Sequence, residues 1–383
     1  MSIPWRAAFL LAAAIPFIYY CLAIFSSWRF FRQARRARSV DFTPPVSILK
    51  PIRGVDPGAY ENFASFCRQD YPEYEIVFCV SGHDDPVAPL IERLQREFPE
   101  RRIVLLYGSG RIAANDKVAK LARMVEEARH EYVVINDSDV RAQPGYLRTV
   151  VGPLRDARIG ATTCFYTGIE ETSFTDSVQA IGMLSDFYAG ILVAWQLDGV
   201  KFALGPTIAT TRAHLSGFGG YAALENRTAD DLLVGRLIAE QGLEVKLLPY
   251  RVDAVADYQS MRELIHKRLR WIVVMRHMRP LGHLGLLFTQ GLPWSLAAIA
   301  IHPSVAVAAA YLVTYFALRC AMTWMIGVHG LKQRSAWRRM PLIPVWDALS
   351  FGIWVASFLR RSIRWRGADY FIGEGGALAP AGD

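Results

Sequence analysis

The chain has 383 residues and a formal net charge of +8, with 52% hydrophobic and only 20% charged residues. This composition excludes a disordered or low-complexity protein, and the mean hydropathy of +0.18 is high for a soluble enzyme. Thirteen of the 43 basic residues lie in three clusters without acids, which are residues 28–40, 331–339 and 360–366. The rest of the chain is mildly acidic, with 30 basic against 35 acidic residues, so nucleic acid is not expected as a partner.

The five cysteines are odd in number and contain no C-x-x-C spacing. We therefore expect reduced thiols, with neither a disulfide framework nor a zinc site.

The first apolar stretch, residues 7–28, has no charged residue and is followed at once by a basic cluster. A cleaved signal sequence is the alternative, but this stretch is longer than a typical signal core and its charge lies on the C-terminal side. We interpret residues 1–28 as a permanent transmembrane helix. Lys and Arg concentrate in cytoplasmic loops, so the cluster places the next domain in the cytosol and the N-terminus outside.

A second apolar stretch, residues 281–318, contains no Asp, Glu, Lys or Arg and is interrupted by Pro293 and Pro303. Its length predicts paired transmembrane helices over residues 281–328, at about 284–301 and 304–327, joined by a turn outside.

A third apolar stretch covers residues 340–359 and contains Asp347 and two prolines, with basic clusters on both sides. Because both flanks favour the cytosol, we expect a re-entrant or interfacial segment in preference to a span. The rest of residues 340–383 would form a cytosolic tail.

Between the apolar stretches, residues 41–260 alternate short β-rich runs with helical patterns. The predicted strands are residues 46–50, 75–80, 102–107 and 132–136, and the predicted helices between them are residues 57–68, 86–98 and 117–129. This alternation is typical of an α/β fold with a parallel sheet covered by helices. Ligands of such sheets bind at the carboxyl ends of the strands, so we expect the site in the loops that follow them.

Residues 108–113 match the dinucleotide-binding pattern G-x-G-x-x-A. The match lies after the third strand, and two residues separate it from the next helix, whereas the dinucleotide motif opens the first helix directly. We interpret it as a flexible loop.

The strongest local signal is a buried strand that ends in Asp137-Ser138-Asp139. A divalent cation that bridges to a diphosphate needs carboxylate oxygens as ligands. The alternative is a solvated turn in which an Asp caps a helix. The position at the end of a central strand favours a metal or nucleotide site.

Three further charged groups lie at predicted loop or helix starts. Asp85 follows the second strand and lies at the same edge of the sheet as the D-S-D motif, where it could belong to the ligand site. The alternative is that it caps the helix that begins at Pro86. Lys117 opens the helix after the third strand, where a Lys suits a phosphate but can also be an exposed helix-end charge. Asp230 and Asp231 begin a helix after a glycine-rich stretch, and carboxylates at a helix start are ordinarily caps.

Residues 261–280 form a basic segment ahead of the paired apolar helices, with one acid, Glu263. The segment can lie at an anionic membrane surface. Arg270 could equally hold a phosphate, and Trp271 could stack against a ligand.

The ordered combination of D-D, D-S-D, D-D and basic-x-x-R-W ahead of paired apolar helices resembles the family 2 type of inverting glycosyltransferases. More narrowly, it resembles the ceramide glucosyltransferase family, family 21. The matching segments run over nearly the whole chain and are residues 46–54, 83–86, 115–117, 137–139, 217–220, 229–231, 270–271 and 363–367. The resemblance implies a GT-A-like nucleotide-sugar domain with a parallel-rich mixed sheet and transmembrane helices at both ends of the chain.

The resemblance also implies roles for individual residues. Those implied to bind the nucleotide sugar are Lys50, Asp85, Lys117 and Asp137. Asp139 would hold a divalent cation, Mg²⁺ or Mn²⁺, and Asp231 would be the catalytic base. Lys267, Arg270 and Trp271 would bind the diphosphate and the acceptor, although Lys267 stands where the family has Gln or Arg.

We therefore expect an inverting transfer of a hexose, glucose first, from a UDP-sugar to a membrane lipid, with ceramide as the leading acceptor. The D-S-D motif is more like bacterial relatives than the eukaryotic D-S-G, and one bacterial group glycosylates hopanoids. Transfer of N-acetylglucosamine to a hopanoid polyol is therefore the alternative. The expected location is a multi-pass protein of a bacterial inner membrane with its catalytic domain in the cytosol.

A nucleotide-binding sensor or transport subunit is the rival from another class. Apolar stretches without charged residues, apart from Asp347, argue against a transport pathway.

Overall fold

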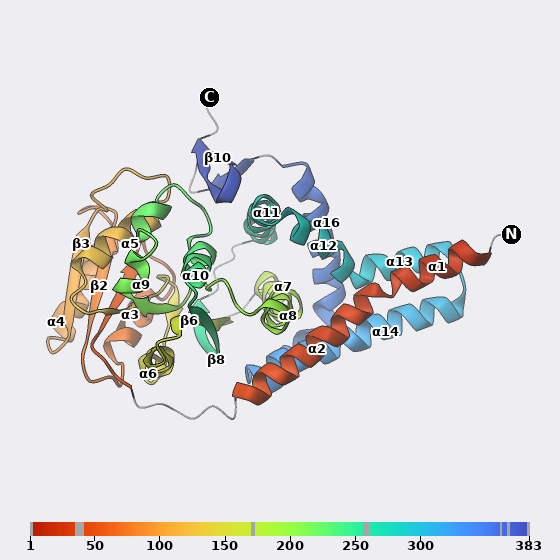
Figure 1. The fold of residues 1–383 in the computed structure, drawn as a ribbon, viewed down its shortest axis with the longest axis horizontal. Coiled ribbons are helices and arrows are strands. Elements are labelled where there is room, and N and C mark those ends of the chain that lie inside the picture. The colour runs from red at the N-terminus through yellow and green to blue at the C-terminus, as the bar shows by residue number, and fades with distance from the viewer. Residues whose placement is uncertain are drawn as a thin grey trace. The chain divides into compact units, whose positions relative to one another are not determined.

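The computed structural model describes residues 3–34, 42–169, 173–255, 260–360, 362–365 and 368–380. The chain forms two compact units (Figure 1). The sheet unit comprises Ala37–Glu170 and Val200–Asp257, and the helical unit comprises Met1–Arg36, Glu171–Gly199 and Tyr258–Asp383. The predicted continuous domain 41–260 is thus interrupted, because residues 171–199 belong with the helices.

The sheet unit is built on eight strands in the order β3-β2-β1-β4-β7-β6-β8-β5. Its first half contains the four predicted strands, β1 (Val46–Pro51), β2 (Tyr74–Val80), β3 (Arg102–Tyr107) and β4 (Tyr132–Ile135), each parallel to its neighbours among these four. The second half contains β5 (Val140–Arg141), β6 (Ile159–Ile169), β7 (Ile208–Thr211) and β8 (Glu244–Val255). Strand β7 is antiparallel to β4 and β6, whereas β8 is parallel to β6. The predicted parallel-rich mixed sheet is confirmed.

Helices cover both faces of this sheet, and its central strands are therefore buried (Figure 1). Every residue of β1 and β2 is buried, as expected for strands covered on both sides. The helices of this unit are α3 (Ala59–Cys67), α4 (Ala88–Glu97), α5 (Asp116–Glu127), α6 (Tyr146–Val151), α9 (Arg212–Ser216) and α10 (Asp230–Glu240). Ile48, Phe63, Phe78 and Val134 lie in the core, which leaves the strand ends free to carry polar side chains.

The helical unit contains helices from three separate parts of the chain. They are α1 (Ile3–Ala13), α2 (Ile15–Ala34), α7 (Phe174–Gly182), the π-helical segment η2 (Met183–Phe187), α8 (Tyr188–Asp198), α11 (Met261–Met278), α12 (Pro280–Gly285), η4 (Leu286–Thr289), α13 (Gly291–Ile301), α14 (Val305–Thr323), η5 (Trp324–Gly330), α15 (Ala336–Arg339), η6 (Met340–Leu342) and α16 (Ile343–Phe358). The tail adds a small antiparallel sheet of β9 (Ser362–Trp365), β10 (Ala368–Ile372) and β11 (Leu378–Pro380).

Within the described residues, four helices are long and apolar enough to cross a membrane: Trp5–Gln33, Phe174–Asp198, Val305–Gly330 and Ala336–Phe358. A bent pair, Pro280–Thr289 and Gly291–Ile301, meets the same test with an angle of 56° between its parts. The apolar helices expected near both ends of the chain are therefore present. Sequence analysis did not anticipate Phe174–Asp198, which lies between β6 and β7 in the sequence.

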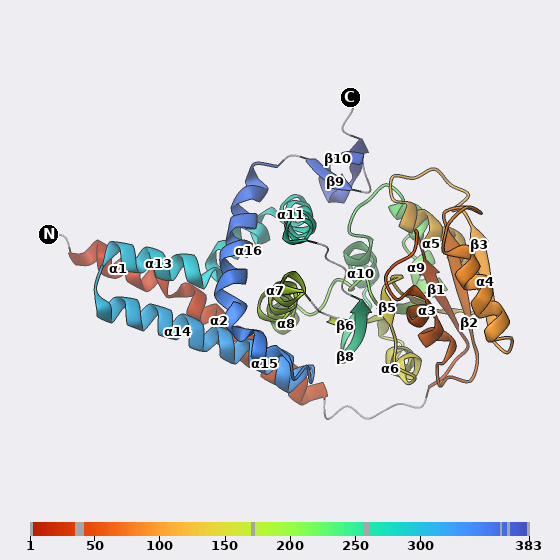
Figure 2. The same ribbon diagram turned by 180° about the vertical axis from the view of Figure 1, so that it is seen from behind.

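Helices α2, α13 and α14 run alongside one another, and the N-terminus lies at the same end as the turn between α13 and α14 (Figures 1 and 2). The Tyr311 hydroxyl donates to the Leu10 carbonyl oxygen at 2.5 Å, which ties α14 to α1 near this end. Helix α16 runs across the direction of the other three, and its expected re-entrant or interfacial placement stays a prediction.

The apolar helices contain more charge than the sequence analysis allowed. Arg319, in the middle of the predicted helix 304–327, forms a buried ion pair with Asp347 of α16, and its Nε lies 3.0 Å from Asp347 Oδ2. The Tyr315 hydroxyl donates to the same carboxylate at 2.7 Å. The expectation that Asp347 is the single charged residue of these stretches is wrong. Its charge is tolerated because Arg319 neutralises it.

Candidate functional site

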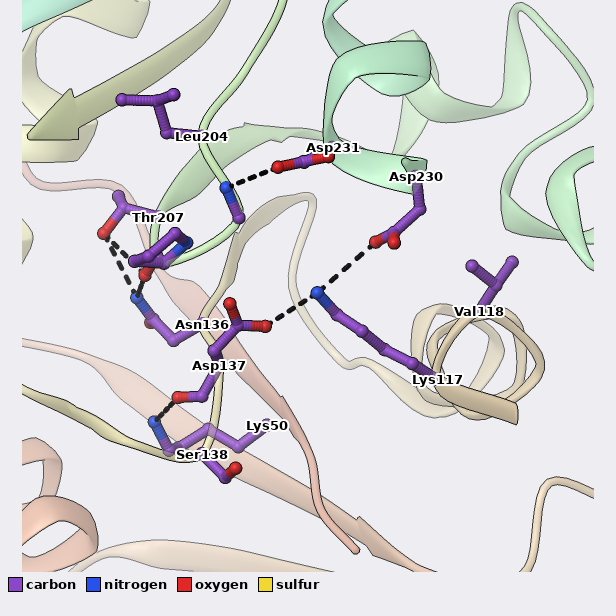
Figure 3. A network of polar contacts seen from close by, with 12 residues as sticks. Lys50, Lys117, Val118, Asn136, Asp137, Ser138, Leu204, Thr207, Asp230 and Asp231 are labelled. Atoms are coloured by element: carbon purple, nitrogen blue, oxygen red, sulfur yellow. Dashed lines mark hydrogen bonds and ion pairs between the residues drawn. The ribbon is translucent and has the colours of Figure 1, made fainter. Parts of the chain in front are cut away.

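A network of charged side chains gathers in the sheet unit where β1 and β4 end and where α5 and α10 begin (Figure 3). The predicted residues that it brings together are Lys50, Lys117, Asp137 and Asp231, with Asp230 as a fifth member.

Lys117, at the start of α5, connects two carboxylates from different parts of the chain. Its Nζ lies 2.7 Å from Asp137 Oδ1 and 3.4 Å from Asp230 Oδ2. Burial by itself would lower the pKa of Lys117, but the charges of Asp137 and Asp230 outweigh it and raise that pKa well above its ordinary value. Lys117 is therefore a fixed positive charge at the site and not a loosely held helix-end group.

Asp231 has different partners from its neighbour Asp230. The backbone N–H of Gly205 donates to Asp231 Oδ2 at 3.0 Å, and the N–H of Leu232 donates to Oδ1 at 2.8 Å. Burial, and next the charge of Asp230, raise the pKa of Asp231 to about 6, although Lys117 opposes the shift. The carboxylate is thus held in one orientation and is poised to exchange a proton near neutral pH.

Gly205 lies where two of these carboxylates converge. A Cβ at this position would stand 3.1 Å from Asp137 Oδ2 and 3.3 Å from Asp231 Oδ2. Both distances are shorter than ordinary van der Waals contact, so only a glycine leaves these oxygens undisturbed. The oxygens of the D-S-D motif and of α10 therefore face one shared space beside the loop that precedes β7.

Lys50 is completely buried at the end of β1, and its ammonium group hydrogen-bonds to the backbone of the D-S-D loop. Its Nζ donates to the Asp137 carbonyl oxygen at 2.9 Å and lies 3.9 Å from the centre of the Phe66 ring. Burial lowers the pKa of Lys50 to about 7, against the opposing effect of the charges of Asp139 and Asp137. The ammonium thus holds the backbone of the D-S-D loop through this hydrogen bond. Its predicted contact with a nucleotide sugar stays a prediction.

Asp85 organises the loop after β2. Its carboxylate accepts backbone N–H groups from Ser81 at 3.1 Å, Val87 at 3.2 Å and Gly54 at 3.5 Å, and the residue is 7% exposed. Burial would raise the pKa of Asp85, but these hydrogen bonds reverse the effect and lower it. Because Gly54 follows β1, this carboxylate joins the two strand ends at which we predict a nucleotide.

Sequence analysis missed Lys120, which is 1% exposed on the sheet-facing side of α5. Its Nζ donates to the Ile52 carbonyl oxygen at 2.7 Å and to Ser81 Oγ at 2.9 Å, and it pairs with Asp116 at 3.0 Å. The available signal was a lysine among the buried, apolar positions of an amphipathic helix, since a buried charge requires partners.

Asn136 is a second residue that the sequence analysis left without a role. Its Nδ2 donates to the Pro206 carbonyl oxygen and to the Tyr146 hydroxyl, both at 2.7 Å. Because Pro206 follows Gly205, this amide fixes the glycine loop against the end of β4.

The D-S-D motif suits a divalent cation. Asp137 and Asp139 follow β4, and the Ser138 hydroxyl between them donates to Asp56, which shapes the turn. In the described part of the chain, no group of three His, Cys, Asp or Glu side chains could enclose a metal ion. Mg²⁺ is commonly bound by one or two carboxylates together with substrate phosphates, so two aspartates in this loop fit such an ion.

The predicted diphosphate and acceptor residues, Lys267, Arg270 and Trp271, form a separate group on α11 of the helical unit. Lys267 Nζ lies 5.9 Å from the centre of the Trp271 ring. Arg268, between them in the sequence, donates twice to Gln179 Oε1, at 2.9 and 2.7 Å. Its guanidinium carbon is 4.8 Å from the Trp271 ring centre, so Arg268 anchors the basic segment to α7, a role that the sequence analysis missed.

Residues 8–378 match the family model described as glycosyl transferase family 21. The chain belongs to glycosyltransferase family 21. The predicted resemblance is therefore confirmed.

The relatives of this family 21 chain include curated ceramide glucosyltransferases. It is 23% identical to ceramide glucosyltransferase 3 of Caenorhabditis elegans over 288 residues, which cover 70% of this chain and 60% of the relative. It is 30% identical to the ceramide glucosyltransferase of Komagataella phaffii over 155 residues, which cover 38% of this chain and 30% of the relative. The chain thus spans 60% or less of the length of these two relatives.

Among solved structures, the family 21 chain is similar to the mannosyltransferase PcManGT from Pyrobaculum calidifontis, which was solved in complex with GDP-Man and Mn²⁺. The TM-score is 0.54 with 20% sequence identity, and the similarity covers 88% of this chain and 99% of that one. This likeness confirms the predicted GT-A-like fold.

Proposed function

We propose that this family 21 glycosyltransferase moves a hexose, glucose first, from a UDP-sugar to a hydroxyl group of ceramide, with inversion at the anomeric carbon. The observation that carries the proposal is Asp231, a carboxylate with a raised pKa that is held beside the Asp137–Lys117–Asp230 network. The names of the curated relatives support ceramide as the first acceptor to test.

Asp231 is the proposed general base. A base works best when its pKa is near the operating pH, and a pKa of about 6 leaves most of the carboxylate ionised at neutral pH. The N–H groups of Gly205 and Leu232 hold its oxygens in place, so it can accept the proton of the acceptor hydroxyl as that oxygen attacks the sugar. A single displacement inverts the anomeric centre, and an α-linked UDP-sugar then yields a β-glycosyl lipid.

The departing UDP accumulates negative charge, which cationic groups of the protein must stabilise. Lys117 is a fixed positive charge at the site in the sheet unit, and Arg270 is the proposed diphosphate ligand of the basic segment. Asp137 and Asp139 would hold Mg²⁺ or Mn²⁺, which when bound supplies further neutralisation of the diphosphate. Lys50 and Asp85 keep the surrounding loops in position through backbone contacts.

We further propose a multi-pass protein of a bacterial inner membrane with the sheet unit in the cytosol, where UDP-sugars are made. The apolar helices and the basic clusters beside them support this orientation. Residues 35–41, 361 and 366, which belong to these clusters or border them, lie outside the described residues. In a cysteine-free background, a cysteine beside Pro303 should react with an impermeant thiol reagent in intact cells, and one at Ser335 should not. Labelling at Ser335 would reverse the orientation.

The activity is tested by incubating the purified full chain with UDP-glucose or UDP-N-acetylglucosamine and with ceramide or a hopanoid polyol. We expect a β-glucosylceramide, identified by mass spectrometry and by its cleavage with a β-specific glucosidase. Formation of an N-acetylglucosaminyl hopanoid alone would replace the ceramide proposal with its alternative, and an α-linked product would exclude inversion.

Two variants serve as controls for that assay. Asp231→Asn should lose activity, whereas Asp156→Asn should keep it. Asp156 is a carboxylate of the same unit whose side chain pairs with Arg158 on the surface.

A further inference from the structure

Asp186 is a carboxylate inside an apolar helix that the proposed mechanism does not use. It lies in η2, the π-helical turn between α7 and α8, within the apolar helical segment Phe174–Asp198. Ionisable residues within apolar spans are costly, and those that are found there ordinarily have a function. Single π-helical turns inside α-helices are also frequent at functional sites. The position and the local geometry of Asp186 thus both point to a ligand.

The carboxylate of Asp186 has hydrogen-bonding capacity to spare. The Ser350 hydroxyl of α16 donates to Asp186 Oδ2 at 3.2 Å, the one hydrogen bond to this side chain from the described residues. An ionised carboxylate has about four acceptor sites. The guanidinium of Arg319, a cation near it in the helical unit, is engaged by Asp347 and by the Ser185 carbonyl oxygen. Asp186 can therefore accept further hydrogen bonds from hydroxyl or N–H groups of a ligand.

Aromatic rings continue from this carboxylate to the basic segment. Phe187, the next residue, packs against Trp271 with 6.1 Å between ring centres. Arg268 lies between Trp271 and Trp346, with its guanidinium carbon 4.8 and 5.0 Å from the two ring centres. A hydrogen-bond acceptor beside large apolar rings matches a molecule with a small polar head and a long apolar body.

We propose that Asp186 and Ser350 form the subsite for the hydroxyl-bearing polar head of the lipid acceptor. Asp186 accepts hydrogen bonds from a hydroxyl or an amide N–H of the head group, and the Ser350 hydroxyl orients the carboxylate. The rings of Phe187 and Trp271 contact the apolar part next to the head. This assignment rests on the proposed lipid glycosyltransferase function and adds to it the residues that recognise the acceptor.

The binding test uses the purified full chain in nanodiscs with a ceramide that bears a photoactivatable diazirine near its head group. We expect the label on peptides from residues 174–198 and 343–358, with competition by unlabelled ceramide. Asp186→Asn should reduce this labelling strongly, whereas Asp198→Asn should not. Asp198 provides the matched control because it is a carboxylate at the exposed end of the same helical segment.

The kinetic test separates acceptor recognition from chemistry. Asp186→Asn should raise the KM for ceramide roughly 10- to 100-fold, as expected when a hydrogen bond to a charged group is lost. The KM for UDP-glucose should stay unchanged and kcat should change little. Ser350→Ala should raise the ceramide KM by only about 2- to 10-fold, because a neutral donor to the carboxylate is lost.

Asp186→Glu keeps the charge and moves it by one methylene group. If the negative charge of the carboxylate contributes to binding, this variant should bind ceramide better than Asp186→Asn does. Thermal midpoints of all variants report any loss of folding.

Labelling confined to other peptides, or an unchanged ceramide KM in both Asp186→Asn and Ser350→Ala, would overturn the subsite. Sugar transfer to ceramide that is insensitive to Asp186 would reject the subsite and keep the proposed function. Specific labelling that depends on Asp186, in a protein that glycosylates no lipid, would keep the lipid site and reject the proposed function.

Discussion

Replacing Asp231 with Asn tests the proposed base directly. General-base assistance is typically worth about 10² to 10⁴ in rate, so kcat should fall by that order while UDP binding is kept. The substitution has a small structural cost, because the N–H groups of Gly205 and Leu232 both donate to the carboxylate and an amide has only one oxygen to accept them. One lost hydrogen bond costs about 1 kcal/mol, so the thermal midpoint should decrease only slightly.

The dependence of the wild-type rate on pH follows from the same carboxylate. A base is active when deprotonated, so kcat/KM should fall as the pH decreases through the pKa of Asp231, which is about 6. A single group with that pKa is about 91% deprotonated at pH 7 and about 9% at pH 5, which predicts a roughly tenfold loss of kcat/KM between these values.

Two neighbouring charges should move this acidic limb in opposite directions. Asp230→Asn removes a negative charge that raises the pKa of Asp231, so the limb should shift to lower pH. Lys117→Met removes a positive charge that lowers it, so the limb should shift to higher pH. Shifts of about one pH unit are expected for charges this close.

The assay measures transfer of radiolabelled sugar at subsaturating donor over about pH 4.5–8.5. The variants are compared by the pH at which kcat/KM falls to half its maximum, and not by the maximum itself. The Asp156→Asn variant should reproduce the wild-type midpoint. The assignment of the base would be refuted if the acidic limb stayed at the wild-type pH in both Asp230→Asn and Lys117→Met. It would also be refuted if the Asp231→Asn protein kept a near wild-type kcat.

Three further predictions address the glycine loop, the cation and the helical unit. Gly205→Ala places a Cβ 3.1 Å from Asp137 Oδ2, which should displace this carboxylate. Because small displacements of catalytic groups are costly, kcat should fall by about tenfold or more in a folded protein, and a normal kcat would show that the loop is free to move. Asp139→Asn should abolish transfer and the metal dependence of UDP binding measured by calorimetry, and full wild-type activity in excess EDTA would remove the cation from the mechanism. Arg319→Met leaves the buried carboxylate of Asp347 without its cation, which should cost about 3–5 kcal/mol and lower the thermal midpoint in detergent, whereas the double variant with Asp347→Leu should recover most of this loss; equal midpoints for the single variant and the wild type would contradict the role of the pair.

Strands β1 to β4 of the sheet unit were predictable because each is a short run rich in apolar and β-branched residues and is bounded by polar loops. The predicted strand 102–107 coincides with β3, and the predicted strand 46–50 ends one residue before β1. Strands β1 and β2 are buried along their whole length, so their apolar character does not depend on which partner lies beside them, whereas β3 at the edge of the sheet is only partly buried. The same logic placed the candidate site residues at the strand ends.

The segment Phe174–Asp198 escaped prediction because its composition does not distinguish a core helix from a helix of the apolar unit. It lies between two strands of one sheet in the sequence, and its assignment to the helical unit follows from packing against α2 and α16, which come from distant parts of the chain. Lys120 escaped for a similar reason. Its partners, Ile52 and Ser81, are contributed by other strand ends, and no local pattern announces them.

The sequence by itself determined the βα alternation, the apolar helices near both ends of the chain and the order of the acidic motifs, since each of these depends on neighbouring residues. The tertiary structure decided what the two adjacent acids of α10 do. Asp230 pairs with Lys117, whereas Asp231 turns to the backbone of Gly205. Both partners are distant in sequence, and it is the burial and the charges assembled by the fold that set the pKa of Asp231. Local sequence placed two carboxylates at a helix start, and only the surrounding chain made one of them a candidate base.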